Sequence, residues 1–183
     1  MEIRVKTVGE LKPVLKDSNL PPDNLPAYYM LGKPGENITI LLPQMLGEEF
    51  SKTYGHYHLH QTEEIYTVVY GEGLILLQKV NPAGKVVEIR LATAFKGETV
   101  KIPGDCGHAL INIGASPLIT VDNYNPQLEE HDYDTVTAKH GLGYYIIKDE
   151  ESGWKAEANP HYQNLPPLKD NPSKGLSFDN RCL

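Results

Sequence analysis

The sequence predicts an all-β domain, built as a sandwich or barrel of short strands. Tyr outnumbers Phe by 11 to 3, and the 183 residues include 16 Gly and 14 Pro. This composition favours half-buried strand positions and frequent turns over long helices. In addition, at least seven β-prone runs follow one another, separated by turn residues about every 8 to 12 residues, a spacing typical of a sandwich or barrel.

Residues 1–27 are expected to form a short helix or strand extension to this domain. A helix is predicted over Val8–Lys16 because Thr7 and Glu10 have the spacing of a capping box. In a capping box each of the two side chains accepts a hydrogen bond from a free backbone amide at the helix start. Pro13 lies inside the stretch and disfavours a long helix.

The strands are predicted to continue to residue 160, so that residues 1–160 form one domain. Its most regular part is a hairpin of Glu64–Tyr70 and Leu74–Val80 around a tight turn with Gly71 and Gly73. Residues 161–183, rich in Pro and Asn, are expected to form an irregular tail. Further strands are predicted at Tyr28–Leu31, Ile38–Leu42, Val86–Leu91, Thr99–Ile102, Ala109–Ile113, Leu118–Asn123, Tyr144–Lys148 and Trp154–Glu157.

Composition and charge argue against several classes of function. The chain has 17 Lys and Arg against 24 Asp and Glu, a net charge of −7, whereas binding to the backbone of nucleic acid needs a basic face. No apolar run approaches the roughly 20 residues that span a bilayer, and the first residues lack the hydrophobic stretch of a secretory signal. Cys106 and Cys182 are too few for a disulfide framework or a four-thiolate zinc site. We therefore expect a cytoplasmic protein that binds neither nucleic acid nor membranes.

Side chains suited to metal binding concentrate in residues 53–66. Residues two apart in a strand point to the same face, so His56 and His58 can aim both imidazoles at one point inside a barrel. Glu64 begins the next strand and can face the same interior, and His108 can supply a fourth ligand from the far side. Three neutral imidazoles and one carboxylate suit a divalent first-row metal and leave positions open for substrate oxygens.

Spacing alone leaves two choices open within this set. His60 shares the strand face of the two preceding histidines, so His58 and His60 could bind the metal as a pair instead. Glu63 competes with Glu64, and parity with Tyr66 places Glu64 inward.

A series of short motifs within residues 28–160 carries a likeness to known proteins: Thr53-x-Gly55-His56-Tyr57-His58, Glu64-Ile65-Tyr66, Gly71-x-Gly73, Leu76-Leu77-Gln78, His108, Asn112-Ile113-Gly114, His131-Asp132-Tyr133 and Asn159-Pro160. In these motifs the chain resembles the cupin superfamily and, more narrowly, the archaeal-type cupin glucose-6-phosphate isomerases. A general cupin does not need the motif at His131, so that motif matters most for function. Three departures are that the spacing from His58 to Glu64 is one residue shorter than usual, that Tyr54 stands where a lysine is common, and that Asp105 and Cys106 occupy a stretch that is usually aromatic.

The resemblance implies a double-stranded β-helix, the jelly-roll barrel of cupins, and favours the first histidine pair. It implies an isomerase of glycolysis and gluconeogenesis that interconverts glucose 6-phosphate and fructose 6-phosphate through an enediolate. It also implies a homodimer, in which the N-terminal extension could cross to the partner and cover an edge strand. The implied metal is Fe²⁺, with Mn²⁺, Ni²⁺ or Zn²⁺ as alternatives, and the implied ligands are His56, His58, Glu64 and His108.

The resemblance also assigns roles around the substrate. Glu64 is the expected proton shuttle, although a hydride shift would need no base. Lys52 adjoins the motif and could replace the missing lysine as a phosphate contact. Further catalytic roles, in steering hydroxyls or opening the sugar ring, fall to Tyr66, His131 and Tyr133. Contacts to the sugar phosphate are implied for Thr39, Thr53, Gly55, Tyr66, His131 and Tyr133.

Two other functions suit the same ligand set. One is an Fe(II) cupin dioxygenase, which the motif His131-Asp132-Tyr133 disfavours through the family likeness. The other is a cupin that binds a sugar or metabolite without catalysis. A binding module gains little from an open metal site, so the presence of all four ligands disfavours this second alternative.

Overall fold

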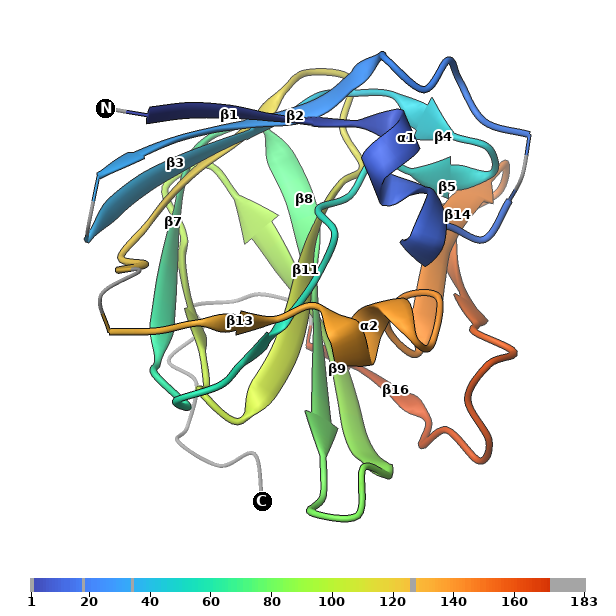
Figure 1. The fold of residues 1–183 in the computed structure, drawn as a ribbon. Coiled ribbons are helices and arrows are strands. Elements are labelled where there is room, and N and C mark those ends of the chain that lie inside the picture. Colours follow the sequence, from blue (N-terminus) through green and yellow to red (C-terminus); the bar gives the residue numbers. More distant parts are fainter. Residues whose placement is uncertain (1, 18, 34, 126–127, 172–183) are drawn as a thin grey trace.

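Two β-sheets face each other and close into a barrel (Figure 1). This computed structural model describes residues 2–17, 19–33, 35–125 and 128–171. The larger sheet contains, in spatial order, β1 (Glu2–Thr7), β2 (Pro26–Lys33), β3 (Glu36–Leu41), β12 (Leu118–Asp122), β7 (Glu64–Tyr70) and β10 (Thr99–Ile102). The smaller sheet contains β11 (Cys106–Asn112), β8 (Glu72–Val80), β9 (Val86–Phe95) and β16 (Leu168–Asn171).

The order of the strands in space is that of a jelly roll. Along the chain, β7 lies in the larger sheet, β8 and β9 lie in the smaller one, and β10 returns to the larger one. The next two strands, β11 and β12, again lie in opposite sheets. A chain that passes repeatedly between two sheets winds them into a double-stranded β-helix. The predicted all-β jelly-roll barrel is therefore confirmed.

Strand β7 illustrates how the sequence builds this barrel. Glu64, Tyr66 and Val68 are buried, whereas the residues between them are more exposed, because successive side chains of a strand point to opposite faces. The strand ends at Gly71, whose φ of +82° is in the left-handed region and where a Cβ would lie 2.4 Å from the Pro117 carbonyl oxygen. Only glycine fits this turn, which explains why the predicted end of β7 is the observed one.

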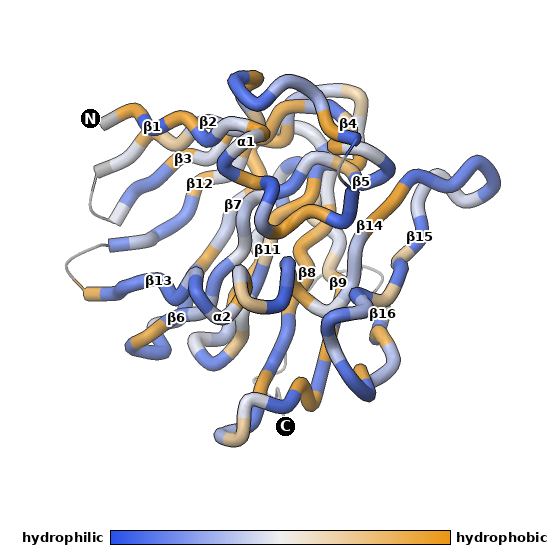
Figure 2. The backbone as a smooth tube through the Cα atoms, turned by 45° about the vertical axis from the view of Figure 1, so that its right-hand side comes forward, coloured by the Kyte–Doolittle hydropathy of each residue, from blue (hydrophilic) through white to orange (hydrophobic). Residues whose placement is uncertain are grey.

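A third sheet packs on the outer face of the smaller sheet. Its order is β15 (Gly153–Ala158), β14 (Tyr144–Asp149), β5 (Glu49–Phe50) and β4 (Met45–Leu46). Figure 2 shows a hydrophobic stretch in β14, and Ile146 on this strand lines one small cavity together with Leu76 and Ala109 of the barrel. Strands β4 and β5 were not predicted, because a run of two residues is too short to show alternation.

The N-terminal extension confirms the capping box and shortens the predicted helix. The Thr7 hydroxyl accepts a hydrogen bond from the Glu10 N–H, and the Glu10 carboxylate accepts one from the Thr7 N–H. Helix α1 spans only Val8–Leu11 and continues as a 3₁₀ turn, η1 (Lys12–Val14). Pro13 has no N–H to extend an α-helix. Strand β1 pairs with β2 of its own chain, so the extension adds an edge strand to the larger sheet.

Two short elements lie across one end of the barrel. Strand β13 (His131–Asp132) pairs with β6 (Tyr57–His58), and helix α2 (Asp134–Thr137) follows it. Figure 1 shows β13 and α2 in front of the barrel strands.

The segment after residue 160 is not wholly irregular, contrary to our expectation. Strand β16 (Leu168–Asn171) pairs in parallel with β9, because the unpaired edge of β9 offers backbone donors and acceptors that the tail can satisfy. Residues 172–183, with Cys182, lie outside the described part of the chain. Within the described residues, no helix combines the length and apolar character needed to cross a membrane.

Candidate metal centre

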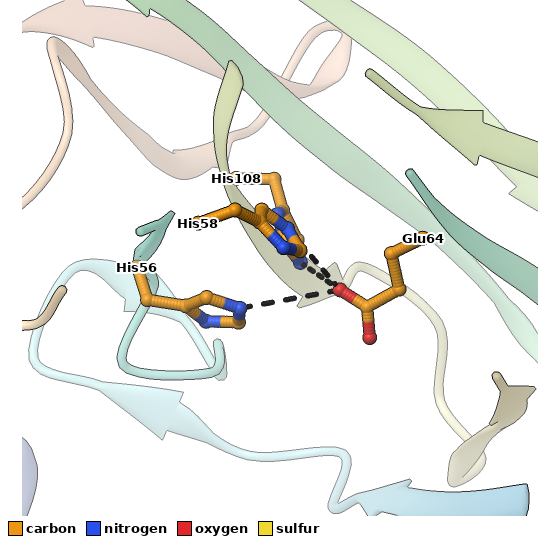
Figure 3. Close-up of side chains that lie close together, drawn as sticks. All are labelled: His56, His58, Glu64 and His108. Carbon is orange, nitrogen blue, oxygen red and sulfur yellow. Dashed lines mark ion pairs between the residues drawn. The ribbon is translucent and has the colours of Figure 1, made fainter. Parts of the chain in front are cut away.

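Four side chains from three separate parts of the chain converge inside the barrel: His56, His58, Glu64 and His108 (Figure 3). One oxygen of Glu64, Oε2, lies 4.0 Å from His56 Nε2, 3.5 Å from His58 Nε2 and 3.2 Å from His108 Nε2. One ligand atom from each residue lies within 4.8 Å of the other three. This is the predicted ligand set.

The backbone holds these side chains in place. His56 and His108 form an antiparallel bridge, in which each backbone N–H donates to the carbonyl oxygen of the other residue. Gly55 precedes this bridge with a φ of +80°, and a Cβ on it would lie 3.2 Å from the His108 carbonyl oxygen. A glycine at this position lets the two ligand-bearing strands approach. Glu64 is the first residue of β7 and faces the bridge from the larger sheet.

Several buried polar atoms of the cluster lack hydrogen-bond partners. Among the described residues, His56 Nε2, both ring nitrogens of His58 and Glu64 Oε2 are buried and unpaired. Leaving such atoms unsatisfied costs free energy. A divalent cation would bind the imidazole and carboxylate lone pairs at once, so the donor set fits a metal ion.

Burial also sets the protonation of the cluster in favour of metal binding. Burial lowers the pKa of His56 well below its ordinary value and lowers that of His108 to about 3. Burial, with the nearby His108, lowers the pKa of His58 as well. The three imidazoles are therefore neutral near pH 7, the form in which histidine binds metals.

Two buried acidic residues lie at the cluster: Glu64, which was predicted from the sequence, and Asp122, which was not. Burial raises the pKa of Glu64, and burial together with the charge of Glu64 raises that of Asp122. Asp122 accepts hydrogen bonds from the Asn37 side chain and the Tyr124 N–H, each at 3.1 Å. Asp122 was missed, because its only sequence signal is one polar residue at an inward position at the end of β12.

Comparison with known proteins identifies the family. The sequence model of the glucose-6-phosphate isomerase (GPI) family matches residues 35–163, which include all four residues of the cluster. The chain belongs to this family.

Individual relatives agree with this assignment. The chain is 35% identical over 128 residues to the glucose-6-phosphate isomerase of Pyrococcus horikoshii, covering 69% of this chain and 63% of that one. It is 37% identical over 116 residues to that of Thermococcus litoralis, covering 63% of this chain and 56% of that one. The chain thus spans less than two thirds of the length of these relatives. Among solved structures, the oxalate decarboxylase of Lactobacillus farciminis is similar with a TM-score of 0.44 and 20% identity, over 62% of this chain and 32% of that one.

Three residues for which the GPI resemblance implied catalytic roles lie beside the cluster. The His131 ring stacks on that of His56, with centroids 3.6 Å apart, and its Nδ1 lies 3.1 Å from the Tyr133 hydroxyl. The Tyr66 hydroxyl lies 3.3 Å from His108 Nε2. Burial and the neighbouring Glu64 raise the pKa of Tyr66 well above its ordinary value, so the phenol stays protonated. Of these three residues, only Tyr133 is well exposed, at 42%, which places it at the surface end of the site.

Thr53 and Thr39 are two further residues for which the resemblance implied contacts to the sugar phosphate. Thr53 accepts a hydrogen bond on its hydroxyl oxygen from the Leu110 N–H at 3.0 Å. Thr39 is buried on β3, paired with Thr120. Paired residues share a face of the sheet. Thr120 also pairs with Val68, which is on the buried face of β7 together with Glu64, so Thr39 points into the barrel.

The structure decides between the competing residues of the GPI motif. His60 is exposed and only its backbone N–H is engaged, by Glu129. The Glu63 side chain is 47% exposed and pairs with Lys101 at 3.3 Å. Cys106 is buried, and its thiol lies 3.6 Å from Asp105 rather than in the metal cluster. Only the pair His56 and His58, with Glu64, converges.

Lys52 lies on the wrong face of its strand for the predicted contact with a phosphate. It bridges Ile111, and bridged residues share a face, whereas His108, three residues away on β11, points to the opposite face. The Lys52 ammonium lies 2.5 Å from the fully buried Glu49 carboxylate and 5.1 Å from the centre of the Tyr145 ring. Its position indicates a structural ion pair and argues against the predicted contact with the substrate.

A substitution tests this correction. Lys52→Ala should leave the buried Glu49 carboxylate without its ammonium partner, which is expected to lower the free energy of unfolding by about 3–5 kcal/mol. Urea unfolding measures this loss, with Lys101→Ala as the control, because the Lys101–Glu63 pair is exposed and worth less than about 1 kcal/mol. If Lys52→Ala has the stability of the wild type and a much higher KM for the sugar phosphate, Lys52 is a substrate contact as first predicted.

Proposed function

We propose that this protein is a metal-dependent isomerase that interconverts glucose 6-phosphate and fructose 6-phosphate. The observation that carries the proposal is that His131 and Tyr133 lie directly beside the cluster of three histidines and one glutamate, in a chain of the GPI family. A site that only binds a metal ion would not need His131 and Tyr133 beside it. Together they supply both a site for a cation and polar groups for a sugar.

In the enediolate route that we propose, isomerisation removes a proton from C2 of the sugar and returns it to C1. Glu64 is the proposed shuttle. Its Oε2 faces the three imidazoles, whereas its second oxygen points away from them (Figure 3) and can accept the proton. Its raised pKa, caused by burial, brings it toward the neutral range in which a general base can also give the proton back.

The metal and the remaining residues have separate roles. The cation, for which we propose Fe²⁺, supplies Lewis acidity that stabilises negative charge on substrate oxygens. The Tyr66 hydroxyl, held protonated by burial, donates a hydrogen bond within the site. His131 and Tyr133, joined at 3.1 Å, orient the sugar hydroxyls at the surface end.

A coupled enzyme assay tests the proposal directly. Formation of glucose 6-phosphate from fructose 6-phosphate should be lost after treatment with a chelator and should return on addition of Fe²⁺ or Mn²⁺. Without chelator, at saturating substrate, a turnover on the order of 10 s⁻¹ is expected for an ordinary enzyme. Oxygen uptake without isomerisation would instead indicate a dioxygenase. Binding of the sugar phosphate without turnover, in metal-loaded protein, would indicate a binding module.

Two wider expectations accompany this function. A charged sugar phosphate stays in the compartment that makes it, so we propose that the protein acts in the cytoplasm, in glycolysis or gluconeogenesis. We also propose a homodimer. Strand β1 forms one edge of the larger sheet with Ile3 at 61% and Val5 at 42% exposure, and an edge with exposed apolar side chains favours association. The molecular mass of the protein in solution tests this second expectation.

A further inference from the structure

We propose that Glu129 is a positioning residue of the metal centre, which holds the loop between two ligands and orients the ring of His58. This inference rests on the proposed function, because it assumes that His56, His58, Glu64 and His108 bind a metal. Glu129 was not among the residues selected from the sequence. It lies just before β13, 71 residues along the chain from His58, and is only 3% exposed.

Both carboxylate oxygens of Glu129 bind backbone amides. Oε1 accepts from the N–H of His60 at 2.9 Å and from the N–H of Glu130 at 3.0 Å. Oε2 accepts from the N–H of Thr62 at 2.9 Å. Two of these amides belong to the loop of residues 59–63, which joins His58 to Glu64. One side chain therefore fixes the connection between two ligands of the same centre.

The same loop is held from another direction by the turn that leads to His108. A Cβ on Gly104 would lie only 1.7 Å from the carbonyl oxygen of Gln61, so the turn and the loop are in direct backbone contact. Gln61 has a φ of +55°, a left-handed conformation that a non-glycine residue keeps only where its surroundings impose it. Glu129 and Gly104 together provide those surroundings.

The charge of Glu129 acts on His58. Its two oxygens accept three hydrogen bonds from backbone N–H groups, an arrangement that favours the ionised carboxylate over the neutral acid. Oε2 of this carboxylate lies 3.8 Å from His58 Nδ1, while Nε2 of the same ring lies 3.5 Å from Glu64 Oε2 in the cluster.

This arrangement selects one tautomer of His58. A negative charge beside Nδ1 favours the proton on that nitrogen, which leaves the lone pair of Nε2 directed at the metal. A carboxylate behind a metal-binding histidine commonly acts in this way, and its loss costs about 10–100-fold in metal affinity.

The variant Glu129→Gln tests the inference, because glutamine has nearly the same shape but no charge. The matched control is Glu130→Gln, since Glu130 is adjacent and exposed. Two quantities are measured: the dissociation constant for Mn²⁺ alone, and the protonated ring nitrogen of His58 in metal-free protein, from the ¹⁵N chemical shifts of the ring. We expect a roughly 10–100-fold weaker Mn²⁺ affinity, with a shift of the His58 proton from Nδ1 toward Nε2. The control should match the wild type within about twofold.

A purely structural role gives a different result. If Glu129→Gln only lowers the melting temperature, while the Mn²⁺ affinity of the folded protein and the His58 tautomer stay unchanged, the inference is overturned. Should that variant fail to fold, Glu129→Asp keeps the charge on a shorter side chain, and retention of the Nδ1 proton with weakened Mn²⁺ binding is then expected. If Glu129→Asp instead leaves the Mn²⁺ affinity unchanged, the inference is likewise overturned. Neither measurement uses sugar phosphate, so a wild-type protein that binds Mn²⁺ without isomerase activity would overturn the proposed function and not this inference.

Discussion

The variant His108→Ala should be purified without its metal. His108 is the only residue of the cluster that comes from the smaller sheet, and its side chain is 2% exposed, so the variant removes one of four buried ligands. Loss of a direct ligand should weaken metal binding more than the loss of a residue that merely orients one, that is by more than about 100-fold. Isomerase activity should fall with the metal content.

Metal analysis of the purified protein measures this effect. The control is His60→Ala, which removes an exposed histidine from the same motif and should leave the metal content unchanged. Equal metal content in His108→Ala and the wild type would show that the ligand assignment is wrong. A loss in both variants would point to His60 as a ligand and would contradict the observed cluster.

Glu64→Gln should reduce turnover far more than substrate binding. Glutamine keeps one carbonyl oxygen that can remain near the cation, but it cannot take up and return a proton. A positioned general acid–base group contributes about 10²–10⁴-fold to a reaction rate, so kcat should fall by that factor, with a KM change of less than about threefold. Such a pattern marks an interaction made in the transition state.

This experiment needs the metal content and the two kinetic constants of the same sample. Glu63→Gln is the matched control, because Glu63 is adjacent and exposed and pairs with Lys101. Its kcat should equal that of the wild type within about twofold. A metal-loaded Glu64→Gln protein with normal kcat would favour a hydride shift, which needs no base. If the variant has lost its metal, the fall in kcat reports the ligand role of Glu64 and contradicts a separate assignment as the base.

Local sequence determined the barrel strands and the residues of the candidate metal centre. The bounds of β7 and β10 were predicted correctly because alternation of buried and exposed residues and the neighbouring glycine and proline turns are local properties. The residues of the candidate metal centre could be identified for a similar reason. The spacing of His56 and His58, with an acidic residue at the start of the next strand, is itself a local pattern that only needs the strand period to be interpreted.

The tertiary structure alone decided which face and which partner each side chain has. Strand parity could not separate His60 from His56, because the strand β6 is only two residues long and the chain then turns, so a period of two no longer applies. Lys52 forms an ion pair with Glu49 and does not reach the predicted phosphate site, because its backbone forms a bridge with Ile111 of β11. Glu129 reaches the loop of residues 59–63 from a remote part of the chain. Hydrogen bonds and ion pairs of this kind depend on distances between segments far apart in sequence, which no local period encodes.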